Sequence, residues 1–311
     1  MRRSGSAALA KRRKLTARAV GLYGMVLPAA LLLFVFNYVP MYGIIIAFQD
    51  FMPYLGPFRS PWVGLKHFIY FLQDPKFWAV MRNTLLINFY DIVLGFTAPI
   101  LFALLANELT QIRFKKTVQT ISYLPHFLSW VVVAGMMYQV LSPSENGLVN
   151  ILLGRFFGTK PIFFMTEINL FRPLVVTLDI WKSVGWGAIL YFATIAGVDS
   201  SLYEAAYIDG ASRLQQVRHV TIPSLLSIVV LLLLLRLSGI FTIGFERIFL
   251  LQNPVVYSVA DVISTYIYRL GLEQAQFSLT TAIGLVQSVL GFALLLGANR
   301  LSSRLAGLGL Y

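Results

Sequence analysis

The sequence predicts an all-α polytopic membrane protein of about six transmembrane helices. Of its 311 residues, 58% are hydrophobic and only 12% are charged, whereas about a quarter of the residues in soluble domains are charged. The mean hydropathy of +0.74 is too high for one water-excluded core, because the surface of a soluble protein must stay largely polar. We therefore expect lipid to cover the remaining apolar side chains.

Six stretches are long and apolar enough to be membrane helices, since one crossing takes about 20 apolar residues. The expected spans are Val20–Ala47, Leu85–Ala106, Thr117–Leu141, Leu174–Gly197, Ile222–Gly244 and Leu279–Ala298. The first run is far longer than the apolar region of a signal peptide, so it is interpreted as a retained signal anchor. One membrane domain at 20–298 is expected between tails at 1–19 and 299–311.

Basic residues outside the spans predict the orientation. If the N-terminus is inside, the expected cytoplasmic segments hold fourteen Lys or Arg. The longer outer segments hold nine, which are Arg59, Lys66, Lys76, Arg82, Arg155, Lys160, Arg172, Arg247 and Arg269. Positive residues gather on the cytoplasmic side of membrane proteins, so both termini should be cytoplasmic. The same clustering at the ends of apolar runs explains the net charge of +12 and argues against a nucleic-acid partner.

The outer segments are expected to consist of turns and one short helix. Pro53, Gly56 and Pro57 follow the first span, and Ser142-Pro143 and Asn253-Pro254 mark later turns. Residues 255–268 alternate apolar and polar side chains, which favours a short helix lying at the membrane interface.

Several chemistries are excluded by residue types that the chain lacks. It contains no cysteine, which removes disulfides, thiolate catalysis and Cys-based metal sites. It also contains no Gly-Lys pair, which a phosphate-binding P-loop requires. His67, His126 and His219 lack the spacing of metal ligands.

The loop between the fourth and fifth spans has the most specific pattern. Ser200 or Ser201 could cap a helix that contains Glu204, and Gly210 would then permit a backbone reversal. Leu214, Val217, Val220 and Ile222 predict a second short helix that Pro223 closes as the fifth span begins. The expected structure is a helix, a turn and a helix at the cytoplasmic face, at 199–223.

This loop resembles the EAA signature of the membrane subunits of binding-protein-dependent ABC importers. The residues that match the signature are Glu204, Ala205, Ala206, Asp209, Gly210, Ile222 and Pro223. Further segments look similar to the oligosaccharide and polysaccharide branch of that family, including Tyr38-Val39-Pro40, Leu124-Pro125, Gly244 to Leu251, and Thr265 to Arg269. The resemblance covers essentially the whole chain.

The resemblance implies a type I ABC importer permease fold in a bacterial cytoplasmic membrane, with the loop as a coupling helix. In the family this helix docks on a separate ATPase subunit, so that Glu204 would make charged contacts, Ala205 and Ala206 would allow close approach, and Gly210 would set the turn. The implied partners are a second permease subunit, two ATP-binding subunits and an extracytoplasmic solute-binding protein. The chain itself would be no enzyme and hold no cofactor, because ATP and Mg would bind the partner ATPase subunits. The implied substrate is an oligo- or polysaccharide, a class that includes acidic sugars such as alginate and oligogalacturonides.

Polar and aromatic residues within the spans are candidates for the substrate pathway. Ionisable groups are costly in the bilayer and usually face the interior of the bundle, which singles out Asp91, Asp179, Lys182 and Arg236. Sugars stack on aromatic rings and bond to amides, which adds Trp181, Trp186, Tyr191, Phe241, Asn83, Asn88 and Gln139. The alternative is a structural role: Asp179 and Lys182 are three residues apart and could neutralise one another, Arg236 could be a structural partner, and single aromatic residues are more often packing residues.

Two other function classes stay open from the residues alone. An ion-gradient-driven secondary transporter would show inverted repeats and matching broken helices in its two halves, and neither is visible. A membrane-embedded enzyme would need convergent catalytic groups near an interface, and none stands out. The loop could also be an ordinary amphipathic segment that caps the fourth span.

Overall fold

The computed structural model describes residues 19–144, 146–241 and 244–306, with the backbone alone for residues 305 and 306. The basic residues of the expected N-terminal tail and the last five residues of the expected C-terminal tail lie outside the described residues. The chain forms two compact units, Met1–Phe68 with Phe277–Leu285 (unit 1) and Ile69–Gln276 with Val286–Tyr311 (unit 2). The described residues are almost entirely helical, as predicted.

Five described helices are long and apolar enough to cross a membrane, and a bent pair of helices passes the same test together. This confirms the prediction of about six spans. The five are Ala19–Phe48, Pro75–Asn107, Ile168–Ala196, Arg213–Ser238 and Phe277–Arg304, and the bent pair is Ile112–Phe127 with Trp130–Val140.

Unit 1 contains the first span and the turns that follow it. The helix at 19–33 continues through η1 (Phe34–Tyr38), α2 (Val39–Met41) and η2 (Tyr42–Phe48), and most of its apolar side chains are exposed for contact with lipid. The predicted turns are confirmed, with Gly56 at φ +69°. The Phe51 amide donates to the Ser278 hydroxyl at 2.9 Å, which ties this loop to the start of α16 (Phe277–Ala306).

The second span starts ten residues earlier than hydropathy alone predicted. It comprises α4 (Pro75–Tyr90), the π-helical η3 (Asp91–Phe96) and α5 (Thr97–Asn107); α3 (Lys66–Gln73) precedes it. The Asp74 carboxylate accepts the Lys76 amide at 2.9 Å, and Pro75 occupies the first helical position, which favours initiation there. Arg82 and Asn83, which lowered the local hydropathy, therefore lie inside the helix.

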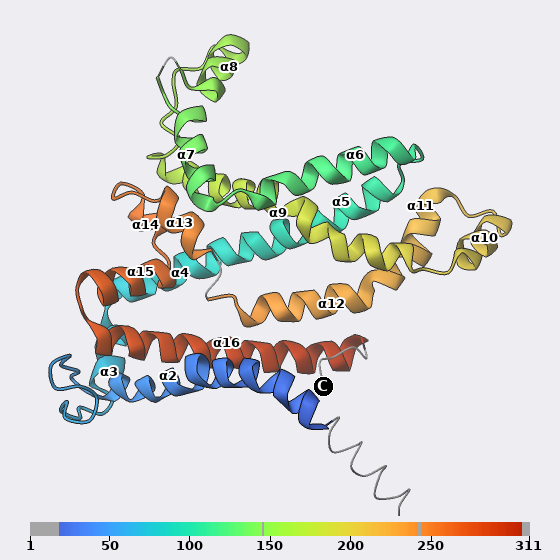
Figure 1. The fold of residues 1–311 in the computed structure, drawn as a ribbon. Helices are drawn as coiled ribbons and strands as arrows, with labels where there is room; N and C mark the ends of the chain where they lie inside the picture. The colour runs from blue at the N-terminus through green and yellow to red at the C-terminus, as the bar shows by residue number, and fades with distance from the viewer. Residues whose placement is uncertain (1–18, 145, 242–243, 307–311) are drawn as a thin grey trace, which may run out of the picture. The chain divides into compact units, whose positions relative to one another are not determined.

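The third predicted span is wrong as one continuous helix. It consists of α6 (Ile112–Tyr123), the 3-10 helix η4 (Leu124–Phe127) and α7 (Trp130–Val140), with a bend of 99°. Pro125 cannot continue the α-helical hydrogen bonding, Leu128 is extended, and Ser129 starts a new helix by accepting the Val132 amide. Figure 1 shows the resulting change of direction between α6 and α7; α8 (Leu148–Phe157) follows.

The core of unit 2 forms where α9 (Ile168–Ala196) packs against the second span. One apolar cluster includes Phe171, Val175 and Ile248, and another includes Ala103, Ala188 and Leu225. Two glycines of α9 allow close approach, because a Cβ at Gly185 would collide with the Ser122 backbone and one at Gly187 would lie 2.9 Å from the Pro99 ring. Small residues have this role wherever membrane helices pack closely.

The fifth span corrects two expectations. Residues 213–238 form one continuous helix of α11 (Arg213–Gln216), π-helical η5 (Val217–Thr221) and α12 (Ile222–Ser238), so Pro223 does not close a second short helix. The wider π turn directly before it removes the need for the amide that proline lacks. The span ends at Ser238 rather than Gly244, and Gly239 follows as its C-cap.

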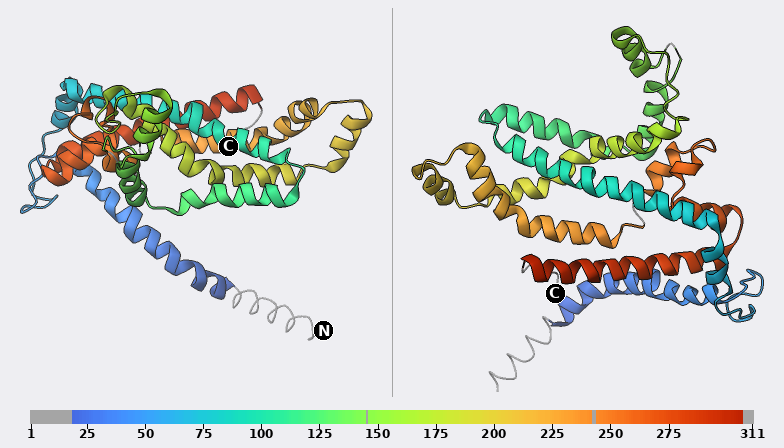
Figure 2. Two further views of the ribbon diagram at one scale, coloured as in Figure 1. Left: turned by 90° about the horizontal axis from the view of Figure 1, so that it is seen from above. Right: turned by 180° about the vertical axis from the view of Figure 1, so that it is seen from behind.

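The expected interfacial helix at 255–268 is also wrong. The segment forms two short helices, α14 (Tyr257–Ala260) and α15 (Ile263–Tyr268), and Ile263, Thr265 and Tyr266 are buried. The helix is interrupted at Asp261 and Val262. The Asp261 carbonyl accepts the Asn83 amide of α4 and the Val262 amide donates to the Thr265 hydroxyl, while the next amide, that of Ile263, donates to Thr84 of α4. Together with α13 (Phe245–Leu251) and η6 (Arg269–Glu273), these helices lie at one end of unit 2, opposite α10 (Ser200–Ile208) and α11 (Figures 1 and 2).

Candidate functional site: the helical loop and the interior charges

The loop between the fourth and fifth spans contains the predicted helix and turn, but the second helix is the start of the fifth span rather than a separate short helix. Asp199, rather than Ser200 or Ser201, caps α10: its carboxylate accepts the Ser201 amide at 2.9 Å. This bond lowers the pKa of Asp199 below its usual value. An aspartate at the last residue before a helix competes well for this role because it also complements the positive end of the helix dipole.

Gly210 ends α10 in the left-handed conformation, with φ +76°, as a glycine after a helix commonly does. The Ala211 amide donates to the Ala206 carbonyl at 2.9 Å and the Gly210 amide donates to the Tyr207 carbonyl at 3.0 Å. Nothing lies within 4 Å of a Cβ built at Gly210, so the backbone conformation, and not space inside the chain, calls for glycine there.

The second arm of the loop is tied to the first by side chains. Ser212 and Gln215 form a reciprocal capping box at the start of α11. The hydroxyls of Tyr203 and Thr221 are 2.9 Å apart and join α10 to η5. The Tyr203–Thr221 contact therefore holds the two arms of the loop together.

The surface of the loop is open and partly apolar. Tyr207 is 76% exposed, Ile208 83% and Leu214 78%. Glu204, Ala205, Asp209 and Gly210 are exposed, Ala206 is half-buried, and Ile222 and Pro223 belong to the first turn of α12. In the described part of the chain no ion pair uses Glu204, so its charge is free to meet a partner.

Three of the four ionisable pathway candidates meet in the interior of unit 2. Arg247, which the sequence suggested was an outer-loop residue, is 1% exposed and binds Asp91 through both terminal nitrogens. Its Nη1 lies 3.1 Å from the Asp179 carboxylate, and Arg236 Nη2 lies 3.8 Å from the same carboxylate. The cluster holds two aspartates and two arginines, so its charges balance.

The expectation that Asp179 and Lys182 neutralise one another is wrong. Asp179 pairs with the two arginines, whereas Lys182 donates to the His126 carbonyl at 2.7 Å and lies 5.6 Å from the centre of the Trp130 ring. The two side chains leave α9 in different directions, and each finds a partner on another helix. Arg236 does have a structural partner, which was the alternative to a pathway role.

The remaining candidates do not form one cluster. Trp186 stacks on His126 with ring centres 4.5 Å apart and is 45% exposed, and Trp181 is 40% exposed. Tyr191 and Phe241 are buried in the packing of unit 2. The Asn88 amide is buried and bonds to its own helix at the Thr84 carbonyl, and Gln139 is exposed on α7.

A polar network at the end of unit 2 opposite the loop was not predicted from the sequence, apart from Asn83. The Asn83 amide donates to the carbonyls of Ser258 and Asp261, each at 3.1 Å, and its oxygen accepts Arg172 Nη2 at 2.7 Å. The Thr84 hydroxyl accepts the Ile263 amide at 2.9 Å. These bonds fasten α4 to the interrupted helix of α14 and α15 and to α9.

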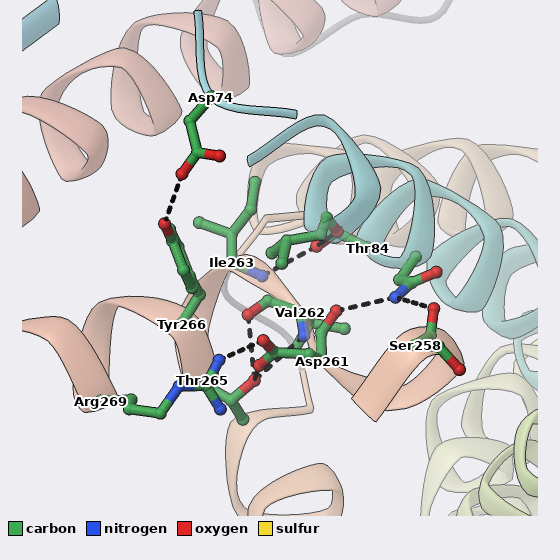
Figure 3. A network of polar contacts seen from close by, with 11 residues as sticks. Asp74, Thr84, Ser258, Asp261, Val262, Ile263, Thr265, Tyr266 and Arg269 are labelled. Atoms are coloured by element: carbon green, nitrogen blue, oxygen red, sulfur yellow. Dashed lines mark hydrogen bonds and ion pairs between the residues drawn. The ribbon is translucent and has the colours of Figure 1, made fainter. Parts of the chain in front are cut away.

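Figure 3 shows the part of this network around Asp261, which also includes Asp74, Tyr266 and Arg269. Tyr266 and Arg269 have shifted pKa values. Burial, with the nearby Asp74 carboxylate that its hydroxyl contacts at 3.2 Å, raises the pKa of Tyr266. Burial alone would lower the pKa of Arg269, but its hydrogen bond and charge pairing with Asp261 outweigh burial and raise it. The Thr265 hydroxyl also donates to Asp261 at 2.8 Å, so each of the two carboxylate oxygens of Asp261 has a bonding partner.

Comparisons with known proteins agree with the resemblance inferred from the loop. A family model described as "Binding-protein-dependent transport system inner membrane component" matches residues 95–307. The polygalacturonan/rhamnogalacturonan transport system permease protein YteP of Bacillus subtilis (strain 168) is 44% identical over 290 residues, covering 93% of this chain and 90% of YteP. The protein LplB of the same organism is 40% identical, covering 93% of this chain and 91% of LplB.

The fold is also similar to solved structures. One is a bacterial ABC transporter involved in the import of the acidic polysaccharide alginate, with a TM-score of 0.87, 38% identity, and coverage of 95% of this chain and 99% of that chain. Another is the bacterial alginate ABC transporter in complex with an alginate pentasaccharide-bound periplasmic protein, with a TM-score of 0.88 and 38% identity, covering 96% of this chain and 99% of that chain.

Proposed function

This chain belongs to the family of binding-protein-dependent transport system inner membrane components, and from that premise we propose that it is the permease subunit of a carbohydrate ABC importer. It forms one half of the translocation pathway, and a homologous permease subunit forms the other half. The chain does no chemistry itself: hydrolysis of ATP with Mg takes place in two separate ATP-binding subunits. Both termini face the cytoplasm.

The observation that carries the proposal is the exposed loop at 199–223. It bears the family signature, its two arms are held together by the Tyr203–Thr221 bond, and it presents exposed Tyr207 and Ile208 beside the unpaired Glu204. Contiguous apolar side chains with a charged rim are typical of a surface that binds another protein. The loop also joins two spans directly, so a displacement of its docked partner would move α9 and α12 together.

The substrate is proposed to be an acidic oligo- or polysaccharide delivered by an extracytoplasmic solute-binding protein. This rests on two similar proteins: YteP, named for polygalacturonan and rhamnogalacturonan transport, and the alginate transporter, solved with a pentasaccharide-bound periplasmic protein. All three polymers carry carboxylates, so a carboxylate is the group that the pathway would have to accommodate.

The coupling role is tested by Glu204→Lys and Gly210→Glu in the assembled importer. Glu204→Lys reverses the free charge, and Gly210→Glu places a side chain on the docking surface at a φ that side chains rarely adopt. We expect either variant to insert into the membrane normally but to retain at least about tenfold less ATPase subunit on purification, because charge reversal at an interface weakens association strongly. Glu273→Lys changes an exposed glutamate at the end of η6, away from the loop in the chain; it is the matched control and should retain ATPase at the wild-type level. Equal retention in all four proteins would refute the coupling assignment.

A further inference from the structure

Two cavities lie at the end of unit 2 opposite the loop. The first, of about 390 Å³, opens between α4 and α9, and Arg172, Asn169 and Tyr90 are among its lining residues. The second, of about 380 Å³, is lined by α4 and the α14–η6 segment, including Asn83 and Lys76. The Arg172–Asn83 hydrogen bond joins the two linings. Both volumes lie in the range of small-molecule sites, about 300–1,000 Å³.

Arg172 is a positive charge held in place by neutral acceptors, with no carboxylate partner among the described residues. Its Nε donates to the Val259 carbonyl at 3.2 Å and its Nη2 donates to the Asn83 side-chain oxygen at 2.7 Å, and both acceptors are neutral. Among the described residues no carboxylate forms an ion pair with it, whereas Arg247 and Arg269 are each paired with aspartates. A guanidinium has five N–H donors, so Arg172 keeps donors free on the side of the first cavity.

The surrounding charges strengthen this imbalance. Arg82 is close enough to Arg172 for the two positive charges to repel each other. The Lys76 ammonium lies 5.8 Å from the centre of the Tyr266 ring, and no carboxylate in the described part of the chain forms an ion pair with it. Arg82 and Lys76 are exposed, whereas Arg172 is half-buried. A like charge near a partly buried cation disfavours its charged form. An anion that enters the cavity would therefore be stabilised by an arginine whose position is already set.

The rest of the lining suits a sugar. Asn169, Thr177 and Tyr90 supply polar groups, while Leu94, Val176 and Ile180 supply apolar surface for the C–H face of a ring. Gly95, the residue after the lining residue Leu94, lies near the interior charges: a Cβ built there would lie 3.7 Å from Arg236 Nη2 and 4.0 Å from the Asp179 carboxylate.

We propose that the cavity around Arg172 is a subsite that binds the carboxylate of an acidic saccharide, with Arg172 as the residue that makes the permease prefer charged over neutral sugars. The guanidinium of Arg172 would form charge-assisted hydrogen bonds to the carboxylate, a geometry that lysine cannot reproduce. The inference rests on the proposed function, because it assigns the substrate's charged group to a place in that pathway.

The test compares binding of trigalacturonate and its neutral methyl ester to the assembled importer in phosphatidylcholine nanodiscs. We expect Arg172→Gln to weaken trigalacturonate binding at least about tenfold, as removal of a charged hydrogen-bond donor does, with little change for the methyl ester. Arg172→Lys should give an intermediate loss. Lys160→Gln, an exposed cation in another loop, is the matched control and should bind like wild type.

Three results would overturn the inference. In the first, Arg172→Gln binds trigalacturonate like wild type. In the second, the variant loses affinity for the methyl ester to the same degree as for trigalacturonate, which means that Arg172 has only a structural role. Nanodiscs containing phosphatidylglycerol could abolish trigalacturonate binding in the wild type, which would identify a lipid headgroup as the occupant. The proposed function fails separately, if no saccharide stimulates ATP hydrolysis by the assembled importer with its binding protein. If trigalacturonate stimulates ATP hydrolysis but any of the three results is found, only the Arg172 subsite is refuted.

Discussion

The interior cluster of Asp91, Asp179, Arg236 and Arg247, in which Asp91 and Arg247 are buried and the other two are half-buried, makes a quantitative prediction about stability. Arg247 is 1% exposed and touches both aspartates, while Asp91, also 1% exposed, has Arg247 as its ion-pair partner in the described structure. Arg247→Met therefore leaves Asp91 without a cation in contact and Asp179 with Arg236 alone, at 3.8 Å. Removal of one partner from a buried ion pair costs about 3–5 kcal/mol, because the other charge stays desolvated.

The loss should be largely recovered when the stranded charge is removed as well. In the double variant Asp91→Asn, Arg247→Met, the cluster keeps only the Asp179–Arg236 pair and is neutral again. We expect it to be at least about 2 kcal/mol more stable than Arg247→Met alone, since neighbouring charges do not contribute additively. Asp179→Asn, which leaves the Asp91–Arg247 pair intact, should cost less, about 1–3 kcal/mol.

The assay is the free energy of unfolding of the purified protein in mixed micelles, measured for wild type, the three variants and a double-mutant cycle. If Arg247→Met costs less than about 1 kcal/mol, or if the double variant loses the sum of the single losses, the charges are not coupled as the geometry requires. A result of that kind would show that these four residues do not act as one structural unit.

Two further predictions concern packing and pH. Gly185→Ala should lower the free energy of unfolding of the purified protein by about 1–3 kcal/mol, because the added methyl group would collide with the Ser122 backbone. Gly135→Ala, in a helix position with open space, should be neutral or slightly stabilising, and equal effects would contradict the packing argument. Because the pKa of Asp199 is lowered in the folded protein, its cap should be fully present above the unfolded carboxyl pKa of about 3.9 and be lost as pH falls through the lower folded value. As the pH falls through that range, the amides of α10 in the wild type should lose protection from hydrogen exchange, after correction for the pH dependence of unprotected amides. In Asp199→Ala the same amides should have this low protection at every pH.

Hydropathy and local turn chemistry were enough to predict the class of fold and the shape of the loop. Apolar runs gave about six spans, and Gly210 followed from the need for a left-handed residue after a helix. The break at Pro125 could have been foreseen from the same chemistry, but its apolar surroundings favoured a single span. Pro223 misled in the opposite direction, because a π turn before a proline has no clear sequence signal.

The interior polar contacts could not be predicted from the sequence. Arg247 and Arg172 lie beside predicted spans, so they were counted as outer-loop charges in the orientation argument. The structure instead pairs Arg247 with Asp91 across 156 positions and bonds Arg172 to Asn83 across 89. Helical periodicity shows which residues share a face of one helix, but it contains no information about which residue of a distant helix meets that face.

The proposed coupling role requires residues 199–223 to lie in the cytosol, where an ATPase subunit can hold them. Because the chain contains no cysteine, a single introduced thiol can measure this directly. A single Ala205→Cys variant places one thiol on an exposed position of α10. A membrane-impermeant maleimide should label it in inverted vesicles and not in intact spheroplasts, and bound ATPase subunits should protect it. Labelling from the outer side would refute the cytosolic location of the loop, and labelling that the ATPase subunits leave unchanged would refute its contact with them.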